Sequence, residues 1–304
     1  MVILLNVDLA QIKLKSPLIL ASGILGTSIP YFRNLEKDVG SITTKSIGVK
    51  PSFGHETPNI IPLKNGILNS MGIPNPGIEY FKHEIKLAKS LLSIPVIVSV
   101  YGEDEDEFRK AAFHAEDAGA DAIELNLSCP HKGKVAQFSE SATLAKSTLE
   151  SVSNSVKVPI FAKLSPNVSN ISKIAVACEN GGAKGICAIN TLKSMKIDIN
   201  MKKPLFPSTF GGLSGPPLHP IAVRCVYEIY QAVSIPIIGT GGVTNWQDAI
   251  ELILAGAKCV GIGTSISIKG ISIFKEINEG IFKYIEKNNY KSINDLVGLA
   301  HRSV

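Results

Sequence analysis

Eight short apolar segments recur along the 304-residue chain, and they do not alternate between polar and apolar positions. Continuous apolar runs of this kind are typical of parallel strands that are buried on both faces. We therefore expect strands at residues 18–22, 41–45, 95–100, 122–127, 159–164, 185–189, 236–239 and 259–262.

The segments between these runs have helical patterns and recurring boundaries. Ala142, Ala145, Leu149 and Val152, for example, fall on one face of a helix. Gly-Ala and a charged residue precede three strands, and each Gly stands where a helix needs a left-handed C-terminal residue. Repeated β-then-α units predict a (β/α)8 TIM barrel in a single domain, residues 1–304, in preference to an open sheet.

Three connections are long enough to carry a function. Residues 46–76, 128–138 and 191–215 follow the second, fourth and sixth strands, so all would lie on the C-terminal face of the barrel. Long loops at this face usually cover a ligand.

Amides, hydroxyls, lysines and glycines gather at the strand ends, where a barrel carries its chemistry. They are Ser22, Lys45, Ser46, Ser99, Asn126, Cys129, Lys163, Asn190, Thr191, Gly241, Gly242, Gly263 and Thr264. The set lacks the carboxylate pair of a glycosidase, and the six His residues have no metal-ligand spacing. No Gly-x-Gly-x-x-Gly follows the first strand, so a dinucleotide fold is not supported.

The fourth strand ends in Asn126-Leu-Ser-Cys-Pro130. Pro130 has no backbone N–H, so the strand should stop before it and leave the Cys129 thiol on a loop. This position makes Cys129 a candidate acid, base or nucleophile. The alternative is a small buried residue that helps the turn to form.

Three further features point to a ligand. Lys163 places a charge in an apolar strand and needs a partner, which could be a bound anion, an electron-rich ring or Glu124. Gly239-Thr-Gly-Gly242 and Gly261-Ile-Gly-Thr264 end the last two strands, where barrels bind phosphate, although ordinary tight turns would also use Gly. The amides in residues 69–77 suit a ring with alternating N–H and C=O groups, although Asn-Pro-Gly is also a turn pattern.

Composition limits the class of protein. Hydrophobic residues make up 45% and charged residues 19% of the chain, which is typical of a globular protein. The net charge of +5 is spread over helix faces, which disfavours a nucleic-acid-binding surface. We expect a soluble cytoplasmic protein without a membrane segment. No Cys-x-x-Cys pair is present, which argues against a metal site or iron–sulfur cluster. Four cysteines have apolar neighbours in the sequence and should be chemically inert: Cys178, Cys187, Cys225 and Cys259.

Taken together, the motifs closely resemble the catalytic subunit of class 1 dihydroorotate dehydrogenases, most of all the class 1B branch. The resemblance runs from about residue 4 to 285 and rests on Ala21-Ser-Gly23, Asn69-Ser-Met-Gly72, Asn75-Pro-Gly77, Asn126-Leu-Ser-Cys-Pro130, Lys163-Leu-Ser-Pro-Asn167, Ile189-Asn-Thr191, Gly211-Gly-Leu-Ser-Gly215, Gly239-Thr-Gly-Gly242 and Gly263-Thr264. Class 2 relatives carry Ser as the base and are associated with membranes, so Cys129 points away from them.

The resemblance implies an FMN enzyme that oxidises dihydroorotate to orotate in pyrimidine (UMP) biosynthesis. Cys129 would remove the C5 proton while hydride passes from C6 to flavin N5. The implied FMN residues are Ser22, Lys45, Ser46, Asn126, Lys163, Ile189, Gly215, Gly241, Gly242, Gly263 and Thr264. The implied substrate residues are Lys45, Asn69, Ser70, Met71, Gly72, Ile73, Asn126, Asn190 and Thr191.

The same resemblance implies a homodimer and a separate subunit with FAD and a two-iron cluster, which together form a heterotetramer. Direct transfer of electrons to fumarate, as in class 1A, is the competing route.

Two features of the chain depart from the family pattern. Ser99 stands where the family usually has Asn, and its shorter hydroxyl reaches less far toward FMN. Residues 131–137, normally a lid over the substrate, differ from both class 1 branches.

Two other functions stay open. A tRNA-dihydrouridine synthase is also an FMN barrel, and the excess of basic residues would suit it, but the Asn-rich loop fits dihydroorotate enzymes better. A flavin-free lyase or isomerase could bind phosphate on the same barrel.

Overall fold

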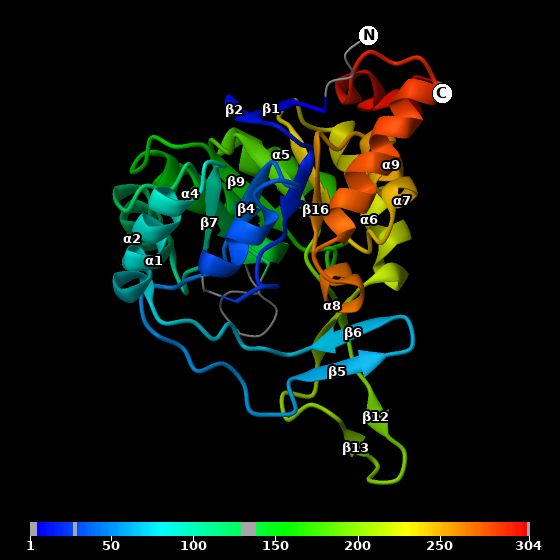
Figure 1. Ribbon diagram of the computed structural model, residues 1–304. Coiled ribbons are helices and arrows are strands. Elements are labelled where there is room, and N and C mark those ends of the chain that lie inside the picture. Colours follow the sequence, from blue (N-terminus) through cyan, green and yellow to red (C-terminus); the bar gives the residue numbers. More distant parts are fainter. Residues whose placement is uncertain (1–4, 27–28, 129–137, 303–304) are drawn as a thin grey trace.

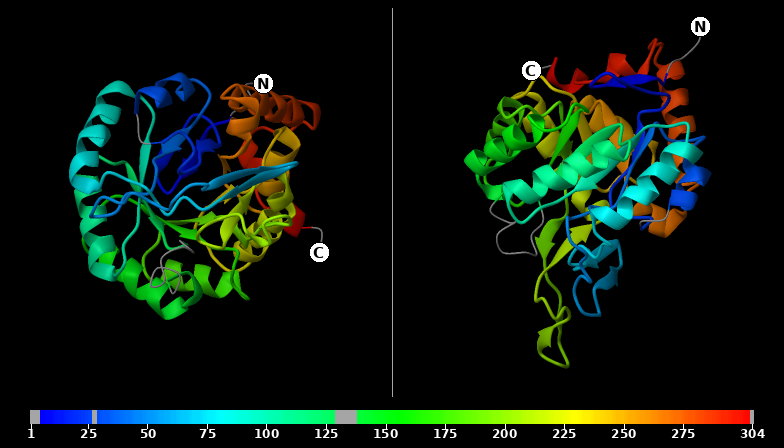
Figure 2. Two further views of the ribbon diagram at one scale, coloured as in Figure 1. Left: turned by 90° about the horizontal axis from the view of Figure 1, so that it is seen from below. Right: turned by 90° about the vertical axis from the view of Figure 1, so that its left-hand side faces the viewer.

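The computed structural model describes residues 5–26, 29–128 and 138–302. Its centre is a closed barrel of parallel strands, which confirms the predicted (β/α)8 fold (Figures 1 and 2). The strands follow one another in chain order, and the last pairs with the first: β3 (Leu18–Leu20), β4 (Ser41–Thr43), β7 (Val96–Val100), β8 (Ala122–Asn126), β9 (Ile160–Leu164), β10 (Gly185–Ala188), β15 (Ile237–Thr240) and β16 (Cys259–Ile262). All eight expected strands are present, although β3 and β4 each end two residues early.

Helices surround the barrel (Figure 2). They are α1 (Ile78–Leu91), α2 (Glu105–Asp117), α4 (Ala142–Ser153), α5 (Ile171–Asn180), α6 (His219–Tyr230), α7 (Trp246–Leu254), α8 (Ser265–Lys269) and α9 (Ile273–Lys287). Short polar residues fix several starts by accepting a backbone N–H: Asp104 from Glu107, Asn170 from Lys173, and Asn245 from Asp248.

The barrel strands are buried on both faces, which explains their continuous apolar sequences. Every residue of β7, β8 and β9 is buried. Four of these buried residues are polar, namely Ser99, Glu124, Asn126 and Lys163. Ser99 and Glu124 are register partners in β7 and β8, and Lys163 of β9 pairs with Cys187 of β10.

Two of the long connections contain strands that the sequence did not predict. They form a four-stranded sheet in the order β11 (Leu192–Ser194), β14 (Gly211–Ser214), β6 (Gly66–Asn69) and β5 (Ile60–Leu63). This sheet lies beyond the C-terminal ends of the barrel strands and crosses the mouth of the barrel (Figures 1 and 2). The two-residue strands β12 (Ile197–Asp198) and β13 (Lys203–Pro204) pair to form an arm that projects further still.

The opposite end of the barrel carries the hairpin of β1 (Val7–Leu9) and β2 (Ile12–Leu14) (Figure 1). Four 3₁₀ segments complete the described chain: η1 (Ile29–Leu35), η2 (Pro216–Leu218), η3 (Ile293–Leu296) and η4 (Leu299–His301). Within the described ranges, no helix has the length and apolar character needed to cross a lipid bilayer.

Candidate active site

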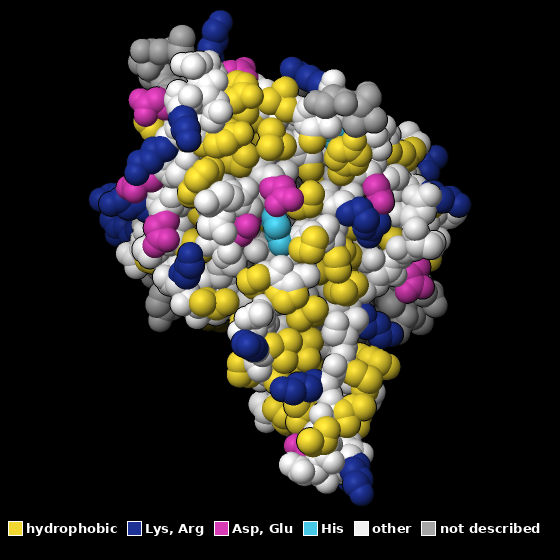
Figure 3. All heavy atoms as spheres, turned by 90° about the vertical axis from the view of Figure 1, so that its right-hand side faces the viewer, with side chains coloured by type: hydrophobic (Ala, Val, Ile, Leu, Met, Phe, Trp, Pro, Cys, Tyr) yellow, Lys and Arg dark blue, Asp and Glu magenta, His cyan; other side chains and the backbone are white. Residues whose placement is uncertain are grey.

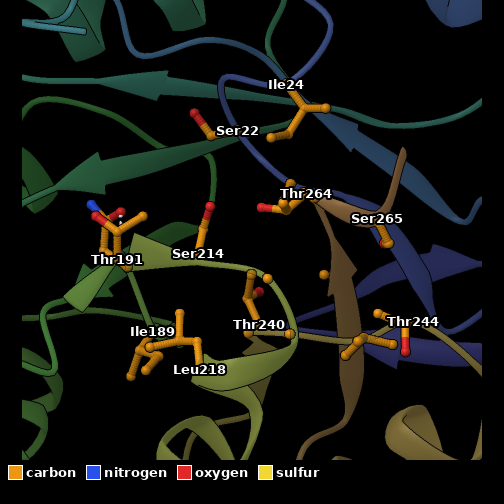
Figure 4. A pocket seen from close by; sticks show the side chains of 18 of the residues that line it. Ser22, Ile24, Ile189, Thr191, Ser214, Leu218, Thr240, Thr244, Thr264 and Ser265 are labelled. Atoms are coloured by element: carbon orange, nitrogen blue, oxygen red, sulfur yellow. Dashed lines mark hydrogen bonds between the residues drawn. The ribbon is translucent and has the colours of Figure 1, made fainter. Parts of the chain in front are cut away.

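A cavity of about 570 Å³, partly open to solvent, lies at the C-terminal ends of the barrel strands. Figure 4 shows how side chains from several of these ends converge on it. Its lining residues are Ala21, Ser22, Ile24, Lys163, Ile189, Asn190, Thr191, Ser214, Gly215, Leu218, Thr240, Gly241, Gly242, Val243, Thr244, Gly261, Gly263, Thr264 and Ser265. A concave site with a few convergent polar groups is typical of small-molecule binding.

The turn after β15 needs glycine for its own geometry. Gly242 has φ +68°, and a Cβ atom there would lie 2.7 Å from the His219 backbone nitrogen and 2.8 Å from the Gly215 carbonyl oxygen. Glycine therefore allows the β15 turn, the end of β14 and the start of α6 to approach one another.

His219 secures this turn. Its Nδ1 donates to the Gly241 carbonyl oxygen at 2.9 Å, and its Nε2 lies 3.1 Å from a carboxylate oxygen of Glu251 in α7. His219 was not a predicted site residue, because its partners come from distant segments.

The turn after β16 offers a different kind of group. The Ser265 hydroxyl is buried at the cavity and has no hydrogen-bond partner among the described residues. A buried polar group without a partner costs stability, so it marks a place where a ligand can supply the missing bond. Together with the glycine turns, this hydroxyl fits a phosphate group.

A network of buried polar side chains lies beside the cavity. Asn126 Nδ2 donates to Ser46 Oγ at 2.9 Å, Ser46 Oγ lies 2.9 Å from Ser99 Oγ, and Ser99 donates to Glu124 Oε1 at 2.9 Å. The same carboxylate oxygen is 3.8 Å from Lys163 Nζ. The Ser99 hydroxyl is thus engaged inside the protein, and Glu124 is a partner of Lys163, one of the three possibilities that the sequence left open.

The ion pair determines the charge state of Lys163. Burial, the largest single influence, lowers the pKa of the Lys163 ammonium, but the charges of Glu124 and Cys187 together hold that pKa above its ordinary value. The Glu124 carboxylate therefore favours the charged form of Lys163 in the cavity wall.

Most residues predicted to bind the cofactor line the cavity. They are Ser22, Lys163, Ile189, Gly215, Gly241, Gly242, Gly263 and Thr264. Lys45, Ser46 and Asn126 are not in the lining, but Asn126 is joined to lining residue Asn190 through Ser128. Asn190 Nδ2 donates to Ser128 Oγ at 2.6 Å, and Ser128 Oγ donates to Asn126 Oδ1 at 2.9 Å.

The predicted substrate residues divide into two groups. Asn190 and Thr191 line the cavity, whereas Asn69, Ser70, Met71, Gly72 and Ile73 do not. Ser70 is buried, and its hydroxyl lies 2.6 Å from Ser208 Oγ and 3.1 Å from His55 Nδ1, so this segment is tied to loops that adjoin the sheet over the barrel mouth. Cys129 and residues 131–137 lie outside the described residues.

The structure also corrects one prediction and adds residues that sequence reasoning missed. Cys187 does not have purely apolar surroundings, because it lies beside Glu124, Lys163 and Thr240; burial nonetheless raises the pKa of its thiol to about 12, which makes it inert. The missed lining residues Ser214, Thr240 and Ser265 each adjoin a predicted glycine or threonine, so the motif boundaries could have indicated them.

The sequence of this chain is similar to those of known proteins along almost its whole length. The family model described as dihydroorotate dehydrogenase matches residues 4–285. The chain belongs to the dihydroorotate dehydrogenase family. Three relatives share the name dihydroorotate dehydrogenase B (NAD(+)), catalytic subunit. The protein of Pyrococcus abyssi is 44% identical over 98% of this chain and 99% of its own length, and that of Methanocella arvoryzae is 44% identical over 96% of each. The protein of Methanocaldococcus jannaschii is 40% identical over 98% of each chain.

This family membership confirms the resemblance to class 1B. The chain is an oxidoreductase of a flavoenzyme family, and its reaction is the oxidation of dihydroorotate in pyrimidine biosynthesis.

Proposed function

We propose that residues 1–304 form one FMN-binding domain that oxidises dihydroorotate to orotate in the cytoplasm, with Cys129 as the base. The observation that carries the assignment of the cofactor site is the cavity at the ends of β15 and β16, with its glycine turns and the unpartnered Ser265 hydroxyl. Bound FMN would supply the acceptor for the hydride that leaves C6 of dihydroorotate.

The residues of the chain divide the work around that cavity. Gly215, Gly241, Gly242, Gly263 and Thr264 would hold the phosphate end of FMN, because close approach of backbone N–H groups favours an anion. Ser22, Lys45, Ser46, Asn126, Lys163 and Ile189 would border the ring. The Lys163 cation would stabilise negative charge that develops there during the reaction.

The substrate would lie between the cavity and the sheet over the barrel mouth. Asn190 and Thr191 reach it from the cavity wall, and we assign Lys45, Asn126 and residues Asn69 to Ile73 to its other sides. Cys129, the proposed base, follows Asn126 by three positions in the sequence. Removal of the C5 proton needs thiolate, and a free thiol has a pKa of about 8.5, so the rate should rise with pH through that region.

Replacement of the base tests the mechanism. Cys129→Ala should retain FMN but slow flavin reduction by dihydroorotate by about 10²–10⁴-fold. Cys178→Ala is the matched control, because Cys178 is buried in α5 and burial raises the pKa of its thiol to about 12. A wild-type rate in Cys129→Ala would reject the assignment.

The cofactor itself separates this function from the two alternatives. Purified protein should be yellow and should release one FMN per chain on denaturation. Colourless, active protein would favour the flavin-free lyase or isomerase, and yellow protein that co-purifies with RNA and ignores dihydroorotate would favour the tRNA enzyme.

Two assemblies complete the proposal. The names of the relatives identify a catalytic subunit that uses NAD(+), which supports transfer of electrons to a separate subunit with FAD and an iron–sulfur cluster. The arm around β12 and β13 exposes several apolar side chains, and Figure 3 shows apolar atoms along this projection. They are Met195, Ile197, Ile199, Met201 and Phe210. Exposed apolar surface of this kind supports the proposed homodimer.

A further inference from the structure

A continuous series of hydrogen bonds runs from a cavity-lining residue through the barrel interior to Glu124, which forms an ion pair with a second lining residue. It begins at Asn190, passes through Ser128 and Asn126, and continues through Ser46 and Ser99. It ends at Glu124, whose carboxylate lies 3.8 Å from the cavity-lining Lys163.

At the Glu124 end of this series, each group donates its hydrogen bond toward Glu124. Ser99 must donate to the Glu124 carboxylate, because an ionised carboxylate only accepts. The Ser99 oxygen then accepts from the Ser46 hydroxyl, and the Ser46 oxygen accepts from the Asn126 amide. Aligned donors polarise one another, so the series stabilises the negative charge on Glu124 and fixes its orientation.

Glu124 contacts Lys163, Ser99 and Cys187, and Lys163 is the only cation among them. Its side chain is 3% exposed and is not part of the cavity wall, whereas Lys163 is. Among the described residues, Glu124 is the carboxylate that forms an ion pair with Lys163. Ion pairs in a barrel interior are weak evidence of stabilisation, because the cost of removing both charges from water offsets their attraction. Stabilisation of the fold therefore does not by itself explain the pair between Glu124 and Lys163.

We propose that Glu124, oriented by Ser99, is a positioning residue that holds the Lys163 ammonium at the cavity wall and sets the reduction potential of the bound flavin. The proposal rests on the FMN site proposed above. A flavin gains negative charge when it is reduced, and a nearby cation favours the reduced form. Glu124 would moderate that preference by holding the Lys163 ammonium at its own carboxylate, which limits how closely the ammonium can approach the flavin.

The midpoint potential of the bound FMN, measured against a dye of known potential, tests this proposal. At a pH low enough to keep Lys163 protonated in the variant, Glu124→Gln should favour the reduced flavin by about tenfold, or about 30 mV for a two-electron couple. Lys163→Met should shift the potential in the opposite direction. Glu124→Gln added to Lys163→Met should have no further effect, because Glu124 acts through Lys163.

A second variant protects the test against misfolding. Ser99→Ala should shift the potential in the same direction as Glu124→Gln but by only a few-fold, because it removes the orienting hydrogen bond and leaves the charge. Ser41→Ala is the control, since Ser41 is a buried β4 serine outside the network. It should leave the potential unchanged.

The outcomes separate this proposal from a structural role and from the proposed function. Variants that lower the melting temperature but keep the wild-type potential would show that the pair is structural and would overturn the proposal. An equal shift from Glu124→Gln with and without Lys163 would also overturn it. Absence of flavin from the wild-type protein would instead refute the proposed function.

Discussion

The Ser265 hydroxyl is a single buried group whose hydrogen-bond partner should come from the ligand. Ser265→Ala should leave the flavin-free protein as stable as the wild type or more stable, because a buried unpaired polar group costs about 1–3 kcal/mol. The same change should weaken FMN binding by about tenfold, since it removes a bond to a charged phosphate. Thermal unfolding without flavin and a fluorescence titration with FMN measure the two effects.

Ser41 provides the matched control for that prediction. It is also buried without a hydrogen-bond partner, but it lies in β4 and does not line the cavity. Ser41→Ala should stabilise the flavin-free protein without changing FMN affinity. Equal FMN affinities for Ser265→Ala and Ser41→Ala would place the phosphate elsewhere.

Among the elements, the turn after β16 allows a cleaner test than the turn after β15. A Cβ at Gly263 would contact Ala21 and Ile24 at an ordinary 3.6 Å, so Gly263→Val should fold and narrow the cavity. We expect its FMN content to fall at least about tenfold at an unchanged melting temperature. Gly242→Ala should instead lower the melting temperature, because its Cβ would meet backbone atoms, with a cost of about 1–3 kcal/mol. Full flavin content in Gly263→Val would contradict the assigned cavity.

The elements also show how far the sequence could predict the fold. The barrel strands were predictable because burial on both faces leaves continuous apolar runs, such as Val96–Val100. The sheet over the barrel mouth was not, because β6 pairs with β14 across about 145 positions and such non-local pairing leaves no local pattern. Site residues at strand ends were also predictable, because the end of each apolar run marks the end of a strand. The Ser99–Glu124 bond was not, because it depends on the register of β7 and β8.

At the scale of the whole molecule, the account predicts that the isolated chain is an incomplete electron-transfer system. With dihydroorotate, it should reduce an artificial dye rapidly but reduce NAD poorly, because the proposed FAD and iron–sulfur subunit is missing. Steady-state rates with the two acceptors test this. Efficient NAD reduction by the chain alone would reject the separate subunit, and efficient fumarate reduction would indicate a class 1A enzyme.

The central claim is that dihydroorotate delivers its electrons to FMN bound at the ends of the barrel strands. Anaerobic titration of the flavin-loaded protein with dihydroorotate, followed by the absorbance of oxidised flavin, tests it most directly. We expect the absorbance to bleach in proportion to added substrate, with one orotate formed per flavin reduced. Flavin that binds but stays oxidised in excess dihydroorotate, while a chemical reductant bleaches it, would contradict the account.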